Sequence, residues 1–412
     1  MLKCIDLFAG CGGLSLGLEM AGFETLLFSE INKDAAATFK ANRRSDIVEI
    51  GDVYSFSDNE ISSLTKKWKS LGIEDIDLVA GGPPCQGYSG IGHRRTFQLE
   101  KQDIPSNQLF HQMIRVINGF RPRMFLFENV GGLRTSKWTR EGQTGEIFRD
   151  VLSEFLKVPG YSVRWQFVHS KDYGVPQNRP RILIVGIRND QRFSLRAPLK
   201  SDETILAQTA IAEGLLPRPD HDYPNIEELL SDLCDPNYRG KYSTDSYLTA
   251  PLTRFQKQLR TKKNGDLLKK GDSLTDQEYS SHAPRIVEKF SHMIANNGEI
   301  PEGMRTKKFA QRVLPRQWGA GGPSITATSL PDDYVHYSQP RILTVREWAR
   351  LQMFPDWYVF KGARTTGGRR RAGDPSIGQW ERDVPKYTQI GNAVPVELAR
   401  KIGLHLAGIL RK

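Results

Sequence analysis

Short apolar runs of four to eight residues recur along the first half of the chain, separated by glycine-containing turns and amphipathic stretches. Such runs are typical of strands buried in a parallel sheet, and apolar residues spaced by three and four are typical of helices. The sequence therefore predicts strands at residues 3–8, 24–29, 47–50, 77–80, 124–127, 162–169 and 182–187. It predicts helices at residues 14–21, 59–71, 146–156, 344–352 and 396–410. A further helix, capped by Ser106, is predicted from the apolar face of Leu109, Phe110, Met113, Ile114 and Ile117. This alternation indicates an α/β protein.

The first strand runs into a glycine-rich turn, Ala9-Gly10-Cys11-Gly12-Gly13, and the second strand ends at Glu30, 20 residues after Gly10. Glycines let the backbone approach a ligand closely, and the carboxylate of Glu30 can accept both hydroxyls of a ribose. The dinucleotide fingerprint has a further glycine where this chain has Ser15, which favours a nucleoside without a pyrophosphate, such as S-adenosylmethionine. Asp52, after the third strand, is either a receiver of the adenine amino group or an ordinary turn residue.

A stiff loop, Gly81 to Ser89, follows the fourth strand. Ligands and chemistry in open α/β sheets gather at the carboxyl ends of the strands, and Cys85 is the first nucleophile beyond this one. A cysteine is often a small buried core residue, but this one is flanked by Gln, Gly and Ser and has no apolar face to bury it. We therefore favour a catalytic cysteine.

Two further strand ends carry charged residues. Glu128 comes directly after the apolar run 124–127, where a purely structural carboxylate would be costly, so we favour a functional role. Arg179 and Arg181 alternate at the start of the strand at 182–187. They are either a solvated edge or ligands for anions and carbonyl groups.

Composition and charge narrow the class of protein. The chain has 412 residues, 38% hydrophobic and 25% charged, which is ordinary for a globular protein and long enough for two domains. The net charge of +11 suits a polyanionic partner, nucleic acid before membrane. The four cysteines show no paired spacing, so we expect neither a disulfide framework nor structural zinc, and a reducing cytosol fits. We find no signal peptide and no run that could cross a bilayer.

From about Phe193 the hydrophobic periodicity weakens, and basic residues cluster at 254–270 and 305–316. Basic runs are usually solvated faces, but two of them in one region favour phosphate contact. We expect a catalytic domain at residues 1–192 plus 384–412, and a target-recognition domain with a hinge at 193–383. A polar loop at 90–103 is a candidate lid.

Six blocks resemble, in order, those of the DNA (cytosine-5)-methyltransferases of bacteria and phages. The blocks are Asp6 to Gly13, Pro83 to Ser89, Glu128-Asn129-Val130, Gln177 to Arg181, Arg341 to Pro355 and Gln389 to Val394. They frame nearly the whole chain outside residues 193–340. Tyr88 and Ile31 depart from the family pattern, and Ile31 leaves open which residue stacks on the adenine.

The resemblance implies a doubly wound, mostly parallel, seven-stranded sheet with a smaller target-recognition domain, and double-stranded DNA between them. It implies that the Cys85 thiolate attacks C6 of a flipped-out cytosine, that Glu128 holds and protonates N3, and that Arg179 and Arg181 bind O2 and support the pocket. It implies contacts with S-adenosyl-L-methionine at Asp6, Phe8, Gly10, Cys11, Gly12, Gly13, Glu30, Ile31, Asp52, Val53, Pro84, Leu109, Asn392, Ala393 and Val394. We expect DNA contacts at Gln86, Ser89, Arg254, Lys257, Lys262 and Lys263.

These implications describe a monomeric enzyme of the bacterial cytoplasm, without metal, that modifies DNA in a restriction–modification system beside a restriction endonuclease for the same site. Three alternatives stay open at this point. They are a methyltransferase for tRNA or another RNA, a catalytically inactive DNA-binding relative, and a NAD oxidoreductase. Ser15 counts against the third, and the presence of Cys85 and Glu128 counts against the second.

Overall fold

The computed structural model describes residues 1–84, 105–193, 195, 207–305, 311–317, 323–325, 331–366 and 383–412. The strands are β1 Leu2–Leu7, β2 Phe23–Ser29, β3 Val48–Ile50, β4 Leu78–Gly81, β5 Met124–Val130, β6 Tyr161–His169, β7 Pro180–Arg188, β8 Arg312–Val313 and β9 Tyr334–Val335. The α-helices are α1 Gly13–Met20, α2 Lys33–Ala41, α3 Asp58–Ser70, α5 Phe110–Phe120, α6 Glu146–Leu156, α8 Ile226–Leu230, α9 Arg254–Arg260, α10 Pro284–Ala295, α11 Val345–Arg350, α13 Lys386–Asn392 and α14 Val396–Leu410.

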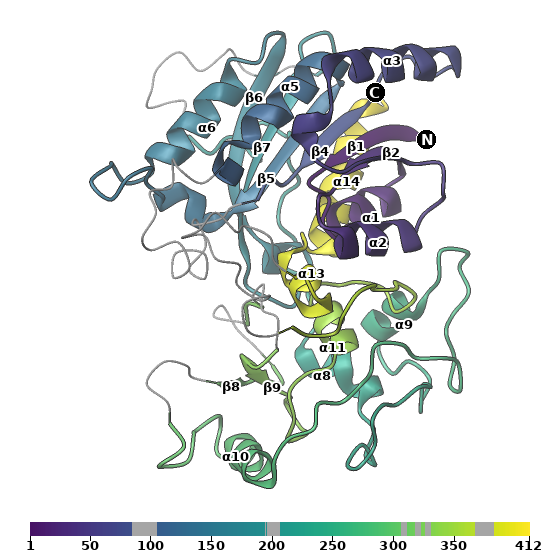
Figure 1. Ribbon diagram of the computed structural model, residues 1–412, viewed down its shortest axis with the longest axis vertical. Helices are drawn as coiled ribbons and strands as arrows, with labels where there is room; N and C mark the ends of the chain where they lie inside the picture. The colour runs from purple at the N-terminus through teal and green to yellow at the C-terminus, as the bar shows by residue number, and fades with distance from the viewer. Residues whose placement is uncertain are drawn as a thin grey trace.

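The seven strands β1 to β7 form one sheet in the order β3-β2-β1-β4-β5-β7-β6, which confirms the predicted doubly wound α/β fold (Figure 1). The five strands from β3 to β5 are parallel, whereas β7 is antiparallel to both β5 and β6. The carboxyl ends of β1, β2, β4 and β5 therefore meet at one edge of the sheet. Because β7 runs the other way, its first residues lie at this same edge.

Alternating residues of the central strands explain the two layers of helices, because successive side chains point to opposite faces of a sheet. Phe125 and Phe127 of β5 pack into a core with α3, α5 and α6, whereas Met124 and Leu126 pack into a second core with α1 and α14. Helices α1 and α14 approach closely, since a Cβ added at Gly17 would lie 2.4 Å from the Cβ of Ala399. This contact brings the C-terminal helix back to the first strand–helix unit.

The lower part of Figure 1 contains α8, α9, α10 and α11 with the two-stranded β8–β9 pair, and we call it the lower lobe. Its core mixes aromatic side chains with buried ion pairs around Trp348. The guanidinium of Arg350 donates to both carboxylates of Asp232 and Asp356 at 2.5–3.1 Å, and all three side chains are fully buried. Buried charges of this kind persist only when they are paired and hydrogen-bonded.

Most predicted elements are confirmed, and α6 and α14 have the predicted bounds. The prediction that Ser106 caps a helix is wrong. Residues Pro105–Gln108 form a 3₁₀ turn that leads directly into α5, whose N-cap is Leu109 without a side-chain cap. The helix predicted at 344–352 ends earlier, at Arg350, and the chain then turns through Met353 with φ = 61°. Strand β5 continues to Val130 because Glu128 and Asn129 pair with Leu183 and Ile182 of β7.

Candidate active site

The glycine turn after β1 forms one half of the site. Gly10 and Gly12 have φ of 56° and 85°, a left-handed conformation that favours glycine, and a Cβ added at Gly10 would meet nothing within 4 Å. The Glu30 carboxylate holds this turn by accepting from the N–H of Gly10 and of Asn32, both at 2.8 Å. Burial raises the pKa of Glu30, and these backbone hydrogen bonds oppose that rise. Since a carboxylate has about four acceptor positions, Glu30 can accept further donors from a ligand.

The floor of the glycine turn is a buried carboxylate. Asp6 is fully buried near the end of β1, and the hydroxyl of Ser15 donates to its Oδ2. Burial raises the pKa of Asp6 to about 7. Ser15 thus fills the place of the fingerprint glycine and supplies a polar partner instead. The neighbouring Cys11 thiol is also buried, donates to the carbonyl of Gln389 at 3.4 Å and has a pKa raised to about 12, so it is a packing residue.

Asp6→Asn is expected to change how stability depends on pH. The folded protein binds the Asp6 proton more tightly than the unfolded chain, whose carboxyl pKa is about 4. The protonated Asp6 carboxyl therefore contributes fully to the free energy of unfolding below about pH 4, and this contribution is lost as the pH rises through 7. Between pH 5 and pH 8 the free energy of unfolding of the wild type should fall by about 2–3 kcal/mol relative to Asp6→Asn. Urea unfolding at both pH values measures this difference. If the free energies of unfolding of the two proteins changed equally with pH, the raised pKa of Asp6 would be contradicted.

The C-terminal segment closes the glycine turn from the other side. A Cβ added at Gly13 would lie 2.4 Å from the carbonyl of Val394 and 3.1 Å from the Cβ of Ala393, so only glycine fits where these backbones meet. Asn392 is exposed beside this contact. Residues from the two ends of the chain, predicted to share one cofactor site, are thus neighbours in space.

The other predicted cofactor residues lie at or just after neighbouring strand ends, except Leu109, which is the N-cap of α5. Phe8 donates its N–H to the Ser29 hydroxyl at 3.0 Å, and β3 reaches the same edge because Glu30 donates its N–H to the Ile50 carbonyl. Asp52 is exposed and its carboxylate accepts the N–H of Tyr54 at 3.0 Å, so the turn role is present. Ile31 is 73% exposed, Val53 is buried, Leu109 is half-buried and Pro84 is exposed. An adenine-stacking residue is not evident among them.

Glu30→Ala is expected to weaken cofactor binding. The substitution removes a charged acceptor and releases the N–H groups of Gly10 and Asn32 that it holds. Hydrogen bonds to charged groups contribute about 1.5–3 kcal/mol, so the dissociation constant should rise about 10- to 100-fold. Calorimetry measures this change, and DNA affinity without cofactor serves as the control because it should stay nearly constant. An unaltered cofactor affinity would remove Glu30 from the site.

The second half of the site is a buried ion pair between β5 and β7. Glu128 and Arg181 are 7% and 4% exposed, and the Arg181 Nε faces the Glu128 Oε1. The antiparallel register, in which Val130 pairs with Arg181, explains why residues so distant in sequence meet. The other carboxylate oxygen lies near Gly82, where an added Cβ would be 2.9 Å from the Glu128 Oε2. The carboxylate therefore stands beside the start of the Cys85 loop.

Asn129 and Arg179 hold the surroundings of this pair. The Asn129 amide donates to the Pro83 carbonyl at 3.2 Å and so holds the start of the Cys85 loop. The Arg179 guanidinium donates to the carbonyls of Ile325 and Gly391 at 2.8 and 2.5 Å. Arg179 thus joins the mouth of β7 to a segment of the second half of the chain and to α13. Its predicted contact with a base stays a prediction, and so do the predicted chemical roles of Glu128 and Arg181.

Several predicted site residues lie outside the described residues. They are Cys85, Gln86 and Ser89, together with the candidate lid at 90–103.

The basic residues predicted to contact DNA lie elsewhere. Lys263 follows α9, and its ammonium donates to the carbonyl of Asn42, just after α2, at 2.7 Å. Arg254 is exposed and pairs with Asp222, and Lys257 and Lys262 are exposed. Arg260, in the same basic run, is fully buried and paired with Asp232, so this part of the run is not a solvated face. The structure does not bring these residues to the Glu128–Arg181 pair.

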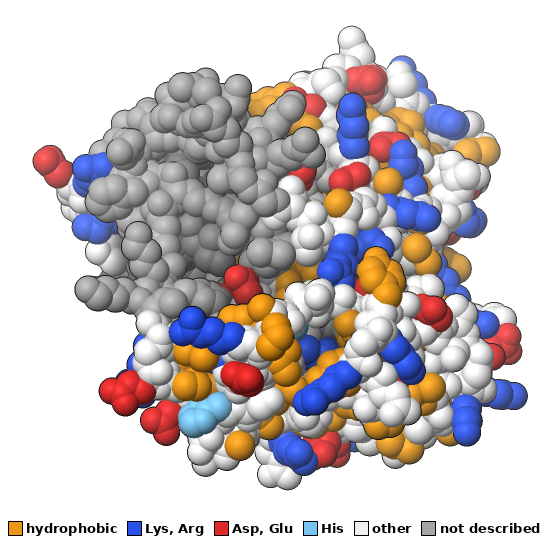
Figure 2. Space-filling model, turned by 60° about the horizontal axis from the view of Figure 1, so that its bottom comes forward, with side chains coloured by type: hydrophobic (Ala, Val, Ile, Leu, Met, Phe, Trp, Pro, Cys, Tyr) orange, Lys and Arg blue, Asp and Glu red, His pale blue; other side chains and the backbone are white. Residues whose placement is uncertain are grey.

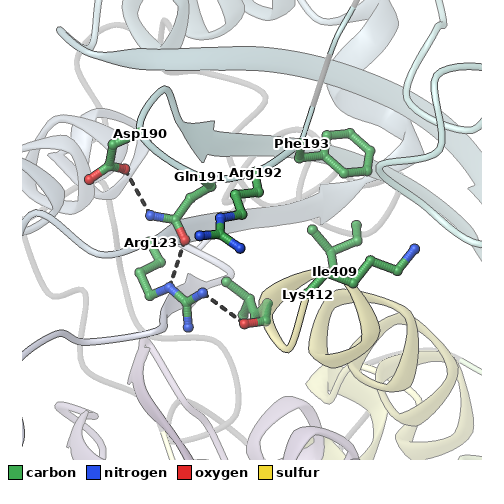
Figure 3. A pocket seen from close by; sticks show the side chains of 8 residues that line it. Arg123, Asp190, Gln191, Arg192, Phe193, Ile409 and Lys412 are labelled. Carbon is green, nitrogen blue, oxygen red and sulfur yellow. Dashed lines mark hydrogen bonds between the residues drawn. The ribbon is translucent and has the colours of Figure 1, made fainter.

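A cavity of about 230 Å³ lies at the opposite edge of the sheet (Figure 3). Arg123, just before β5, donates to Asp77, Gln191 and the Leu410 carbonyl at 2.7–2.8 Å. These bonds tie the start of β5 to the end of α14.

Among the described residues we find no cluster of ligands that could hold a metal ion and no helix long and apolar enough to span a bilayer.

Two buried glutamines complete the site, and the sequence analysis did not single them out. Gln177 lies just before β7 and Gln352 just after α11, both within the matching blocks. The Gln177 amide donates to the Gln352 side chain at 2.8 Å, and Gln352 in turn donates to the carbonyls of Ile390 and Ala393. The available signal was the position of Gln352 between apolar residues, Leu351 and Met353, at a predicted helix end.

Comparisons with known proteins agree with this geometry. The chain is 29% identical to the Type II methyltransferase M.DdeI of Desulfomicrobium norvegicum over 97% of this chain and 87% of that protein. It is 31% identical to the Type II methyltransferase M.XorII of Xanthomonas oryzae pv. oryzae over 99% and 85%. The crystal structure of a proposed DNA modification methyltransferase from an E. coli prophage has the same fold, with 23% identity, a TM-score of 0.67 and full coverage of both chains. The model of the C-5 cytosine-specific DNA methylases matches residues 2–407, and the chain belongs to this family of enzymes.

Proposed function

We propose that the protein transfers a methyl group from S-adenosyl-L-methionine to C5 of a cytosine within a specific double-stranded DNA sequence, through a covalent bond between Cys85 and C6 of a flipped-out base. The observation that carries this proposal is the buried Glu128–Arg181 pair, which stands beside the start of the Cys85 loop at the edge that also holds the glycine turn. Its relatives' description as Type II methyltransferases supports a role as the modification enzyme of a restriction–modification system.

Cytosine C5 is a poor nucleophile, and the residues at the carboxyl edge address this directly. Attack of the Cys85 thiolate on C6 converts the ring to an enamine whose C5 can take a methyl group. Glu128 holds N3 and the exocyclic amine and donates a proton to N3, which neutralises the charge that the attack creates. A base then takes the C5 proton, the Cys85 thiolate leaves C6, and N3 returns its proton to the Glu128 carboxylate, which restores the neutral aromatic ring. Arg181 orients the Glu128 carboxylate, and Asn129 holds Pro83 at the start of the loop to which Cys85 belongs.

The cofactor fits the other half of the edge. The open space at Gly10 admits a close ligand, Glu30 can accept two ribose hydroxyls, and the Asn392–Val394 turn closes the site against Gly13. S-adenosylmethionine, when bound, supplies an electrophilic methyl group on a sulfonium sulfur. The proposed task of these residues is to hold that group toward the C5 position, beside the Glu128 carboxylate.

Sequence reading is assigned to residues 193–383, with catalysis assigned to 1–192 and 384–412. In the view of Figure 2, Lys and Arg side chains of the described residues are interspersed with acidic and hydrophobic ones rather than gathered in one patch. Phosphate contacts position a protein on DNA and base-edge contacts specify the sequence, so a dispersed basic surface is compatible with both tasks. We also propose that the enzyme acts as a monomer in the bacterial cytoplasm and shares its site with a separate restriction endonuclease.

Bisulfite sequencing tests this function, because it reports both activity and target. Plasmid from a host that expresses the wild type should carry 5-methylcytosine at one position of one recurring sequence. Plasmid from a host that expresses Cys85→Ala should carry none. Methylation of host tRNA with unmodified plasmid would contradict the assignment to DNA, and methylation at unrelated sequences would contradict the assignment of a specific reader.

A further inference from the structure

The turn that closes the cofactor site is held by one buried side chain. Gln352 is fully buried, and its amide donates to the carbonyls of Ile390 at 2.8 Å and Ala393 at 3.2 Å. Its own backbone carbonyl accepts the N–H of Val396 at 3.0 Å. Three bonds from one residue thus fix both ends of the Asn392–Val394 turn, which packs on Gly13 of α1. The position of this turn depends on Gln352.

The same glutamine is connected to the mouth of β7 and to the segment 323–325. The Gln177 amide donates to the Gln352 Oε1 and to the Leu351 carbonyl at 2.8 and 2.9 Å, and the Gln177 Oε1 accepts the N–H of Ile325 at 3.3 Å. Arg179 forms a second connection, since it donates to the carbonyls of both Ile325 and Gly391. The N–H of Asn178 donates to the Pro323 carbonyl at 2.7 Å. All six hydrogen bonds join residues that are more than 140 positions apart in the sequence.

We propose that Gln177 and Gln352 are positioning residues that couple DNA binding to cofactor binding. Segment 323–325 belongs to the region assigned to DNA reading, and the 392–394 turn belongs to the cofactor site, so this inference rests on the proposed function. DNA that holds segment 323–325 against Gln177 also holds Gln352, and Gln352 holds the cofactor turn. Binding of either ligand then favours the arrangement that the other requires, and such coupling is reciprocal.

The side chains suit this task because each glutamine both donates and accepts. A buried amide that loses one partner leaves a polar group unpaired, so displacement at one end is costly at the other. An apolar side chain of similar length would fill the space without transmitting this dependence. Gln352→Met and Gln177→Met therefore separate packing from coupling.

The test measures the dissociation constant of S-adenosylhomocysteine by calorimetry, with and without a duplex that contains the methylated sequence. This ligand lacks the methyl group, so no reaction occurs. In the wild type the duplex should lower this dissociation constant at least about fivefold, which is the lower end of typical coupling. In Gln352→Met and in Gln177→Met this ratio should fall below about twofold. Gln177→Met tests the connection independently, because it leaves the Gln352 bonds to the cofactor turn in place.

Gln256→Met is the matched control. Gln256 is also fully buried and uses its amide to bond the Glu228 carbonyl and the Ser231 hydroxyl, but it lies away from the cofactor turn. It should keep the wild-type ratio even if it lowers stability. Gln352→Met could lose the same affinity for S-adenosylhomocysteine with and without DNA, or Gln352→Met and Gln177→Met could both keep the wild-type ratio of dissociation constants. Either result would overturn this inference but not the proposed function. Failure of the wild type to bind S-adenosylhomocysteine would overturn the proposed function as well.

Discussion

Cys85→Ala is expected to lower the single-turnover rate of methyl transfer by at least about 10⁴-fold, the scale of losing an activated nucleophile. Without the thiolate, the ring has no route to the enamine. The cysteine that the structure describes in the glycine turn, Cys11, does not replace it, because burial raises the pKa of its thiol to about 12. DNA binding should remain, because the change removes only a sulfur atom. Rapid-quench measurement with labelled cofactor determines the rate.

Cys234→Ala is the matched control for this variant. Cys234 lies in the lower lobe, where its thiol contacts the Tyr337 hydroxyl at 3.4 Å and the His336 ring at 3.7 Å. It should methylate DNA at the wild-type rate. A comparable loss of rate in both cysteine variants, or a Cys85→Ala rate within tenfold of the wild type, would contradict the assignment of the nucleophile.

Glu128→Gln is expected to lower the single-turnover rate by about 10²–10⁴-fold, the usual contribution of a well-placed acid. The substitution keeps the shape of the side chain but removes the proton donor and the charge that faces Arg181. Rapid-quench kinetics with saturating cofactor and DNA measure the effect on the chemical step. A rate within a few-fold of the wild type would count against the role.

Glu213→Gln separates that effect from the loss of a buried ion pair. Glu213 pairs with Arg164 of β6 at 2.9 Å, and the two side chains are 9% and 4% exposed, much as Glu128 and Arg181 are. Both substitutions should therefore lower the free energy of unfolding, but Glu213→Gln should leave the rate unchanged. Equal rate losses in the two variants would show that stability, rather than proton donation, explains the Glu128 effect.

The seven-stranded sheet and the glycine turn could be predicted from the sequence because the patterns that indicate them are local. The apolar runs, the glycine turn and the carboxylate of Glu30 sit at fixed short spacings, and the structure confirms the predicted strands around them. The approach of Arg181 to Glu128 is different, because it depends on the antiparallel placement of β7 beside β5. Strand order and direction come from packing across the whole sheet, so the sequence could indicate both residues but not their contact.

The lower lobe could be predicted far less well. Its core depends on buried arginines, and a pattern of apolar positions does not reveal them. Arg260 lies in a basic run that the sequence indicates as solvent-facing, yet it is fully buried beside Asp232 and over the Tyr247 ring. The Gln177–Gln352 connection was missed for a related reason, since its meaning lies in partners more than 30 residues away. Polar residues acquire such roles only through tertiary contacts.

Covalent trapping tests the central claim most directly. A duplex with 5-fluorocytosine at the methylated position should form a denaturation-resistant complex with the wild type in the presence of S-adenosylmethionine, because fluorine cannot leave C5 as a proton does. Peptide mapping should locate the DNA on Cys85, and Cys85→Ala should form no complex while it still binds the duplex. A complex that persists in Cys85→Ala, or one attached to another residue, would contradict the account.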